Sequence, residues 1–404
     1  MNLLKDGIEL SAVIPTELSR KLTIDGITQA YPVYKVRLDM LFYNDQNDRI
    51  ATWISQYKSA NKGNAPDVTD RDAYNSLIES FIIKSNPSAI EKTQTNIELV
   101  DQREPGVVLA DGRIIDGNRR YTCLHRLSNK SDRFKYFETV ILNRNIENSA
   151  KQIKMLELSI QHGEESKVEY NSIDRLVGLY NDIIDTKLLS VYEYAKSTNE
   201  PEGDVRKRVE IAELMVEFLD FINAPKQFYI ARDLEVGFPL EELFKLTKKC
   251  KTNDEAEDLK ICVFTNILMK TSNDLGRFVR KFKDIIVSDY ADEFIEEQKA
   301  IAYRVVESLP PKGTVNEKVI RDVIRGNDEL GQELVRSMDK ALTKAKKTET
   351  RNKPVQLIEK ATVFLENIDM NIFLKMNDSE LQRIERQLTK LERVVEEIRG
   401  NINV

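Results

Sequence analysis

Hydrophobic positions along the chain follow two patterns, first that of short strands and then that of helices. Two apolar runs, Val107–Leu109 and Ile114–Ile115, lie on either side of Asp111-Gly112. An Asp-Gly pair between apolar runs is a strong hairpin signal. From about Ser149 onward, apolar residues recur at steps of three and four, which is the spacing of one helix face. The pattern predicts an α+β protein with a small mixed α/β N-terminal domain and a mostly α-helical remainder.

The segment after the second predicted strand has the composition of an anion site. Gly117, Asn118, Arg119 and Arg120 follow Asp116 and open a predicted helix. Glycine lets the backbone approach a ligand closely, and a helix N-terminus offers free N–H groups and a positive dipole end. Arginine adds planar, permanently charged donors that suit phosphate or carboxylate. The layout predicts a nucleotide-phosphate site, and the alternative is an ordinary turn followed by two solvated arginines.

The predicted mixed α/β unit spans residues 31–150. Residues 1–30 are expected to pair with its sheet or pack on it. A helix is predicted at Ala73–Lys84, because its apolar residues follow helical spacing. A polar loop, Lys58–Asp70, precedes that helix. We interpret Ser55–Thr95 as an insertion.

Composition narrows the classes of partner. The net charge is −6, so any contact with nucleic acid needs a local basic surface. No apolar run reaches the 18 residues of a membrane span, and the first residues lack a signal-peptide pattern. We therefore expect a cytoplasmic protein with no membrane contact.

The few cysteines and histidines limit which disulfides and metal sites the chain can form. Cys123, Cys250 and Cys262 are far apart and odd in number, so neither a disulfide framework nor a cysteine metal site is predicted. The chain has only two histidines, His125 and His162, which excludes a multi-histidine metal site. We expect His125 to be structural and Cys123 to be a packed thiol. No metal ligands and no catalytic residues are assigned.

Several segments in order resemble the ParB/sulfiredoxin superfamily, over roughly residues 30–210. Asp116–Cys123 resembles its phosphate-binding box, in which glycine, a polar residue, two arginines and a small residue occur at this spacing. The other segments resemble a first box with its Asn-x-Arg turn, the edge strand after the box helix, and a third conserved segment followed by a helix. They are Tyr34–Leu41 with Asn44, Asn47 and Arg49; Phe137–Leu142; Leu158–His162; and about Tyr170–Ile184.

The resemblance implies a nucleoside triphosphate, with CTP favoured, Mg²⁺ as a possible companion, and a dimer that closes on DNA. Residue by residue, it places the phosphates on Gly117, Asn118, Arg119, Arg120, Asn47, Arg49 and Gln161.

Departures from the family pattern argue against family-type hydrolysis. The family's hydrolytic glutamate and Mg²⁺-binding asparagine correspond here to Leu158 and Ser159, and its arginine corresponds to His162. Leucine neither binds a metal nor positions water. Asn118 stands where the sulfiredoxin box has its cysteine, which argues against sulfinic-acid reduction. We expect nucleotide binding rather than turnover.

A helix-turn-helix is predicted next. Ser190 caps a short helix, Val191–Ser197, and Asp204 caps a second helix, Val205–Phe218. Ala195 and Val205 have the spacing of the residues that pack such a pair, and Asn199 replaces the usual turn glycine. Three basic residues in the first turn of the second helix are candidate DNA contacts: Arg206, Lys207 and Arg208. A surface helix pair without DNA is the alternative.

The C-terminal third is predicted to be helical. Helices are expected near Leu240–Lys249, Ala256–Ser272, Leu275–Val287 and Asp289–Ser308, and after a capping box of Thr314 and Glu317. Lys340–Pro354 is predicted to be a basic linker or an exposed helix end. A final helix capped by Asp378 or Ser379 carries a heptad-like apolar seam, which predicts self-association as a homodimer. The seam is Leu381, Ile384, Leu388, Leu391, Val395 and Ile398.

These patterns predict four parts: residues 1–150 bind nucleotide, 151–223 bind DNA, 224–343 form a helical domain, and 344–404 form a basic linker and dimerisation helix. The favoured function is a ParB-like DNA-binding protein that binds nucleotide. One alternative is an enzyme of the same fold, a nucleotidase, phosphotransferase or nuclease, with Asp116, Glu164 or Glu165 as carboxylates. The other is a non-catalytic scaffold of a mobile-element or defence system, favoured if Arg119 and Arg120 are paired within the protein.

Overall fold

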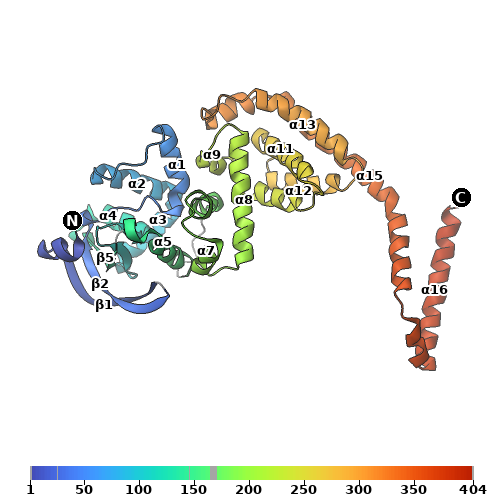
Figure 1. Cartoon of the computed structure of the whole chain (residues 1–404), viewed down its shortest axis with the longest axis horizontal. Helices are drawn as coiled ribbons and strands as arrows, with labels where there is room; N and C mark the ends of the chain where they lie inside the picture. Colours follow the sequence, from blue (N-terminus) through green and yellow to red (C-terminus); the bar gives the residue numbers. More distant parts are fainter. Residues whose placement is uncertain (1, 25, 145, 164–170, 403–404) are drawn as a thin grey trace. The chain divides into compact units, whose positions relative to one another are not determined.

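The computed structural model describes residues 2–24, 26–144, 146–163 and 171–402 (Figure 1). It consists of two units, Met1–Ala341 and Leu342–Val404. The first unit begins with a five-stranded sheet and continues as helices, so the predicted α+β class is confirmed. The four-part division within the chain stays a prediction.

The sheet has the strand order β1-β2-β5-β3-β4. Only the β3–β5 pair is parallel; the other neighbours are antiparallel. The predicted hairpin is confirmed as β3 and β4, and Gly112 in its turn has φ 95°. The strands are β1 (Val13–Ile24), β2 (Ile27–Arg37), β3 (Gly106–Leu109), β4 (Ile114–Asp116) and β5 (Tyr136–Leu142).

The strand after the box helix is central, and its prediction as an edge strand was wrong. Val140 of β5 is paired with Val33 on one side and with Val107 on the other. The edge positions belong to β4 and to β1, and β1 lies in the N-terminal segment that was expected to pair with the sheet or pack on it. The apolar run of β5 fits a strand that is buried on both faces.

Helices cover both faces of the sheet. Alternate strand residues point to opposite faces, so apolar strands such as β3 present side chains on both faces that helices can bury. Val108 and Ile114 join one buried cluster with α2 (Arg71–Ser85), α3 (Pro87–Val100) and α4 (Asn118–Ser128). Val107, Leu109 and Ile115 join a second cluster on the other face, with Ile153, Leu156 and Ile160 of α5 (Ile146–Gly163).

The region between β2 and β3 contains more helix than the pattern predicted. Helix α2 confirms the prediction at Ala73–Lys84, but α1 (Ala51–Ala60) and α3 were not expected. Short helical turns complete the region and its flanks. They are η1 (Leu3–Gly7), η2 (Leu38–Met40), η3 (Asp48–Ile50) and η4 (Asp132–Phe134).

Helices make up the remainder of the first unit, as expected. Two predicted caps were wrong. Helix α8 begins at Glu202 with Pro201 at its N-cap, so Asp204 lies inside it. Asn316, and not Thr314, accepts the capping hydrogen bond at Glu317–Val319. The elements are α6 (Ser172–Leu179), η5 (Tyr180–Asp185), α7 (Val191–Thr198), α8 (Glu202–Phe221), α9 (Phe228–Asp233), α10 (Gly237–Thr247), α11 (Asn253–Met269), α12 (Leu275–Ile286), α13 (Ala291–Glu307), α14 (Glu317–Val319) and η6 (Ile320–Ile324).

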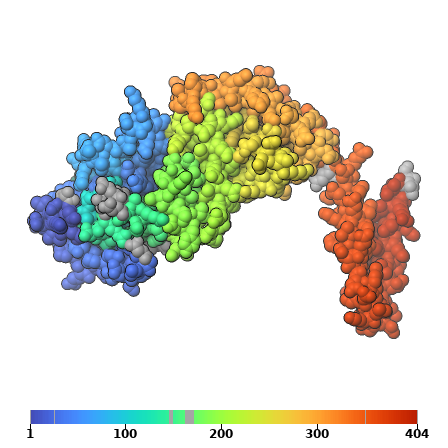
Figure 2. All heavy atoms as spheres, in the orientation of Figure 1, coloured from blue at the N-terminus to red at the C-terminus, as the bar shows by residue number. Residues whose placement is uncertain are grey.

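The second unit contains the end of α15 (Asp328–Glu366), η7 (Met370–Lys375) and α16 (Asp378–Ile402). Lys340–Pro354, predicted to be a basic linker or an exposed helix end, lies within the continuous helix α15, which has Pro354 inside it. Asn377 accepts the capping hydrogen bond from the N–H of Glu380, so the predicted caps Asp378 and Ser379 were wrong. None of the described residues of α16 is buried, and this unit is the orange-to-red part of Figure 2. Among the described residues, no helix is long and apolar enough to cross a membrane.

Candidate anion-binding site

The loop after β4 has the backbone that the sequence predicts for an anion site. Gly117 is left-handed, with φ 101°, and forms the N-cap of α4. A Cβ atom here would lie 2.7 Å from Cζ of Phe137 on β5. Only glycine fits both the dihedral angle and the space, so this residue fixes where α4 begins.

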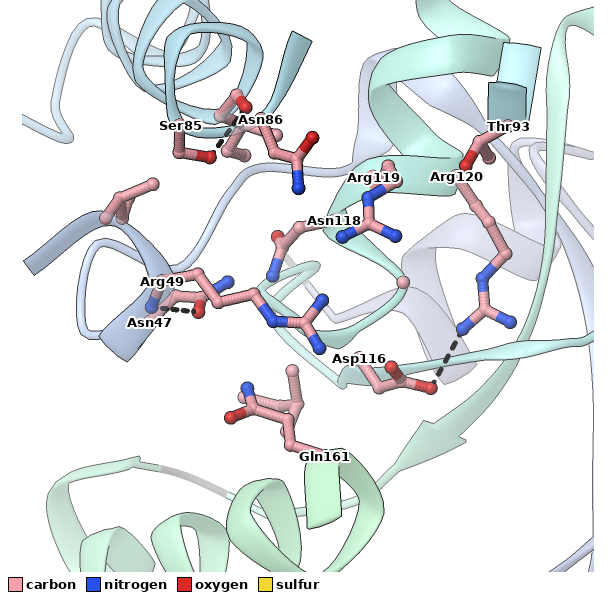
Figure 3. Close-up of a pocket in the computed structure, with 14 residues that line it drawn as sticks. Asn47, Arg49, Ser85, Asn86, Thr93, Asp116, Asn118, Arg119, Arg120 and Gln161 are labelled. Carbon is pink, nitrogen blue, oxygen red and sulfur yellow. Dashed lines mark hydrogen bonds and ion pairs between the residues drawn. The ribbon is translucent and has the colours of Figure 1, made fainter. Parts of the chain in front are cut away.

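A cavity of about 200 Å³ lies at this helix start. It brings together all seven residues proposed for phosphate contacts, from three separate parts of the chain (Figure 3). Its volume is below the ~300–1,000 Å³ of pockets that enclose whole small ligands, and fits part of a nucleotide such as its phosphates. The lining is Asn47, Arg49, Ile50, Ile82, Ser85, Asn86, Thr93, Ile115, Asp116, Gly117, Asn118, Arg119, Arg120 and Gln161.

The Asn47–Arg49 turn is held by a local hydrogen bond. The Oδ1 atom of Asn47 accepts from the N–H of Arg49 at 3.0 Å, which is how asparagine stabilises a turn. Asn47 is buried. The turn therefore places Arg49 on the wall of the cavity that faces the start of α4 (Figure 3).

The two arginines of the loop differ in their surroundings. Arg120 donates from Nη2 to Oδ2 of Asp116 at 3.0 Å. The same carboxylate oxygen accepts from Arg20 of β1 at 2.9 Å, and Arg20 also donates to the carbonyl of Pro105. Figure 3 shows Arg120 directed at Asp116, whereas Arg119 is directed toward Asn118. We interpret Arg120 mainly as a support of the loop, and Arg119, together with Arg49, as a cation of the cavity lining.

Asn118 supplies a polar atom inside the site. Its side chain is buried, and no described residue donates a hydrogen bond to its Oδ1 atom. Buried polar atoms without a partner are uncommon in folded proteins, and this acceptor suits a donor group or a cation of a ligand rather than a phosphate oxygen. The cavity lining as a whole holds three arginines against one aspartate, which is already paired with arginines. This charge balance suits an anion.

A buried ionic cluster lies directly behind the cavity, and the sequence analysis missed it. Nζ of Lys154 on α5 lies 2.7 Å from Asp48, 3.5 Å from Asp182 and 3.9 Å from Glu157. All four side chains are buried. Gln161 of the cavity donates from Nε2 to Oε1 of Glu157 at 3.0 Å. The spacing of Lys154, Glu157 and Gln161 along one helix face was the available signal.

Burial changes the acidity of this cluster, because it disfavours the charged form. It raises the pKa of Glu157 to about 7, although Lys154 opposes the shift. It raises the pKa of Asp182 to about 8, again against Lys154. Glu157 and Asp182 therefore hold protons near neutral pH.

Other predicted residues have structural surroundings. Cys123 is buried, and burial raises the pKa of its thiol to about 12. His125 lies 2.9 Å from a carboxylate oxygen of Glu79 at the surface. Glu164 and Glu165 lie outside the described residues, as does the side chain of His162. Of the described residues, no three His, Cys, Asp or Glu gather as a metal site.

Helices α7 and α8 lie where the helix-turn-helix was predicted, and their role as a DNA-binding pair stays a prediction. Asn199 at the turn is left-handed, with φ 53°, and Ala195 and Val205 are both buried. The basic residues lie in the second turn of α8, not the first. Arg208 pairs with Glu200 through both ends of its guanidinium group, and Arg206 lies 3.0 Å from Glu202. Lys207 is exposed.

Among known proteins, the similarity that can be described is weak and concerns the fold alone. No protein-family model matches the chain, and no curated protein matches it. Among solved structures, a Pnob8-like ParB-N domain is similar, with 13% sequence identity and a TM-score of 0.33. The match covers 76% of this chain and 98% of that one. A likeness this weak assigns no function, so the residues of the cavity have to carry the proposal.

Proposed function

We propose that this protein binds the phosphates of a nucleoside triphosphate, with CTP favoured, in the cavity at the start of α4. The observation that carries the proposal is the convergence of Asn47 and Arg49, the Gly117–Arg120 loop and Gln161 on one cavity. These residues come from three separate parts of the sequence. The arginines would neutralise the phosphates, and the N–H groups of the helix start would donate to them.

Binding without hydrolysis is the chemistry that the residues favour. Leu158 is buried in α5, where it neither positions water nor binds a metal ion. Asp116 accepts from Arg20 and Arg120, so this carboxylate is engaged in supporting the loop. A Mg²⁺ ion that accompanies the nucleotide would be held chiefly by its phosphates, since Mg²⁺ binds with few protein ligands and substrate oxygens.

DNA binding and self-association complete the proposal. The α7–α8 pair supports DNA binding, with Lys207 and Arg206 as the contacts, while Arg208 is tied to Glu200. The exposed apolar residues of α16 support a homodimer, because burying such a seam against the same seam of a second chain removes apolar surface from water. They include Leu381, Leu388, Val395 and Ile398.

A thermal-shift experiment tests the nucleotide proposal. A ligand that binds only the folded protein raises the free energy of unfolding by RT ln(1 + [L]/Kd), and therefore raises Tm. We expect one Mg²⁺–nucleotide among CTP, ATP, GTP and UTP to raise Tm of the wild type, and Arg119→Ala to abolish the shift. Arg126→Ala is the matched control, since Arg126 is exposed on the same helix. Equal shifts in the two variants would contradict the proposed site.

A further inference from the structure

The buried cluster is connected to the cavity by two side chains. Gln161 lines the cavity and donates to Glu157, whose carboxyl lies in the cluster. Arg49 also lines the cavity, and its charge acts on Glu157, where it favours the ionised form. The cluster and the anion-binding cavity therefore share a wall.

The cluster holds three carboxyl groups around the one ammonium group of Lys154. Asp48 lies between Asn47 and Arg49 in the turn, and its carboxylate accepts from Lys154 at 2.7 Å. This carboxylate also packs against Gly178 of α6, where a Cβ atom would lie 2.4 Å from its Cγ atom. Charged or titratable side chains reach the cluster from every element packed around it. They are Asp48 and Arg49 of η3, Lys154 and Glu157 of α5, Asp174 and Arg175 of α6, Asp182 of η5 and Tyr194 of α7.

We propose that anion binding in the cavity takes up a proton at the Glu157–Asp182 pair, so that nucleotide affinity falls as pH rises. The inference rests on the proposed nucleotide site. The physical reason is Coulombic: phosphates neutralise Arg49 and add negative charge beside Glu157, and both changes favour the protonated carboxyl. A proton bound together with a ligand makes ligand affinity depend on pH, by the same linkage that governs folding.

Glu157 is in this account a positioning residue with a titrating carboxyl. It fixes the side-chain amide of Gln161 at the cavity wall, and its protonation state decides how much negative charge lies behind the phosphates. Glutamine at position 157 retains an oxygen that accepts from Gln161 but has no proton to gain. Glu157→Gln therefore separates positioning from titration.

Calorimetry of the full chain tests the inference. CTP, ATP, GTP and UTP, each with Mg²⁺, are titrated in two buffers of different ionisation enthalpy, and over a range of pH from about 6.5 to about 8.5. The wild type is expected to take up a fraction of a proton per nucleotide and to lose affinity with pH, by at most about tenfold per pH unit. Glu157→Gln is expected to bind with less proton uptake and a flatter pH profile. Asp182→Asn is a second variant in case the first does not fold.

Asp185→Asn is the matched control, because Asp185 lies on the same η5 turn but is exposed and pairs with Lys226. It should retain the wild-type proton uptake. Protonation of the nucleotide itself would persist in Glu157→Gln, so the difference in uptake between that variant and the wild type reports the cluster. Binding with the same uptake in Glu157→Gln and the wild type would overturn the inference and leave the nucleotide site intact. No binding of any nucleotide by the wild type at any pH would overturn both.

Discussion

Nζ of Lys154 lies 2.7 Å from Oδ1 of Asp48, and this buried ion pair joins residues that are 106 positions apart. It ties α5, which covers one face of the sheet, to the turn that carries Arg49. Removing one partner of a buried pair leaves the other charge without compensation in a medium of low dielectric constant. The pair therefore supports both the fold and the geometry of the cavity.

Lys154→Met should destabilise the protein by about 3–5 kcal/mol at neutral pH, because the buried carboxylate of Asp48 loses its counter-ion. Urea unfolding measures the loss. Lys151→Met is the control, since Lys151 lies one turn earlier on α5 and pairs with Glu193 nearer the surface. That variant should lose less than about 1 kcal/mol, and equal losses would show that burial of the pair contributes nothing.

The buried cluster should make the stability of the protein without nucleotide depend on pH. The pKa of Asp182 is about 8 in the folded state, above the ordinary 3.8, so the folded state binds more protons than the unfolded state between these values. Stability from this group is full below about pH 4 and is lost as pH rises toward about 8. Asp182→Asn should therefore gain stability relative to the wild type from pH 6 to pH 8, at most about 1.4 kcal/mol per pH unit. Chemical denaturation at several pH values measures this difference, and Asp185→Asn should show none.

Gly117→Ala should distort the loop, because alanine at φ 101° is strained and its Cβ would collide with Phe137. We expect a loss of about 1–3 kcal/mol and a loss of nucleotide binding. Gly203→Ala is the matched control, since Gly203 lies in α8 with nothing within 4 Å of the added atom. It should be neutral or stabilising by up to about 1 kcal/mol. If both variants unfold at the same denaturant concentration, the loop does not need glycine.

Leu388→Glu should convert a dimer into a monomer. Leu388 lies in the middle of the α16 seam and is 42% exposed in the single chain. A charge at this position should therefore leave the monomer stable but destabilise a dimer in which two seams pack together. Sedimentation velocity measures the change. Lys390→Glu, on the polar face, is the control and should leave the dimer intact. A wild-type protein that sediments as a monomer would refute the self-association.

Lys207→Ala should weaken DNA binding and reduce the slope of log affinity against log salt by about one, as expected for one lost phosphate contact. Lys283→Ala on α12, which is also an exposed lysine, is the control. Arg208→Ala should instead lower stability, because it leaves Glu200 with fewer partners. Unchanged DNA affinity in Lys207→Ala would remove α8 as the DNA-contacting helix.

The sequence predicted the elements whose local signals are strong. The Asp111-Gly112 hairpin and helix α2 formed as expected, because turn chemistry and apolar spacing act over a few residues. Helix α3 was missed because only Ile90 and Ile97 of its 14 residues are buried, which is too few for a clear periodic pattern. The central place of β5 depends on pairing with distant strands, which no local pattern reveals.

The candidate site was predictable only in part for the same reason. The loop residues could be selected from their types and spacing, and Asn47, Arg49 and Gln161 from a family resemblance. Arg20 and Asp48 could not, because their partners Asp116 and Lys154 are 96 and 106 residues away. Buried charges of this kind become visible only when the fold brings their partners together.

The most direct test of the account is the affinity of the full-length protein for CTP, ATP, GTP and UTP, each with Mg²⁺, measured by isothermal titration calorimetry. The account predicts saturable binding of one nucleotide by the wild type and by Arg126→Ala, with binding lost in Arg119→Ala. Absence of binding by the wild type, or binding that survives Arg119→Ala unchanged, would contradict the assignment of the cavity as a nucleotide-phosphate site.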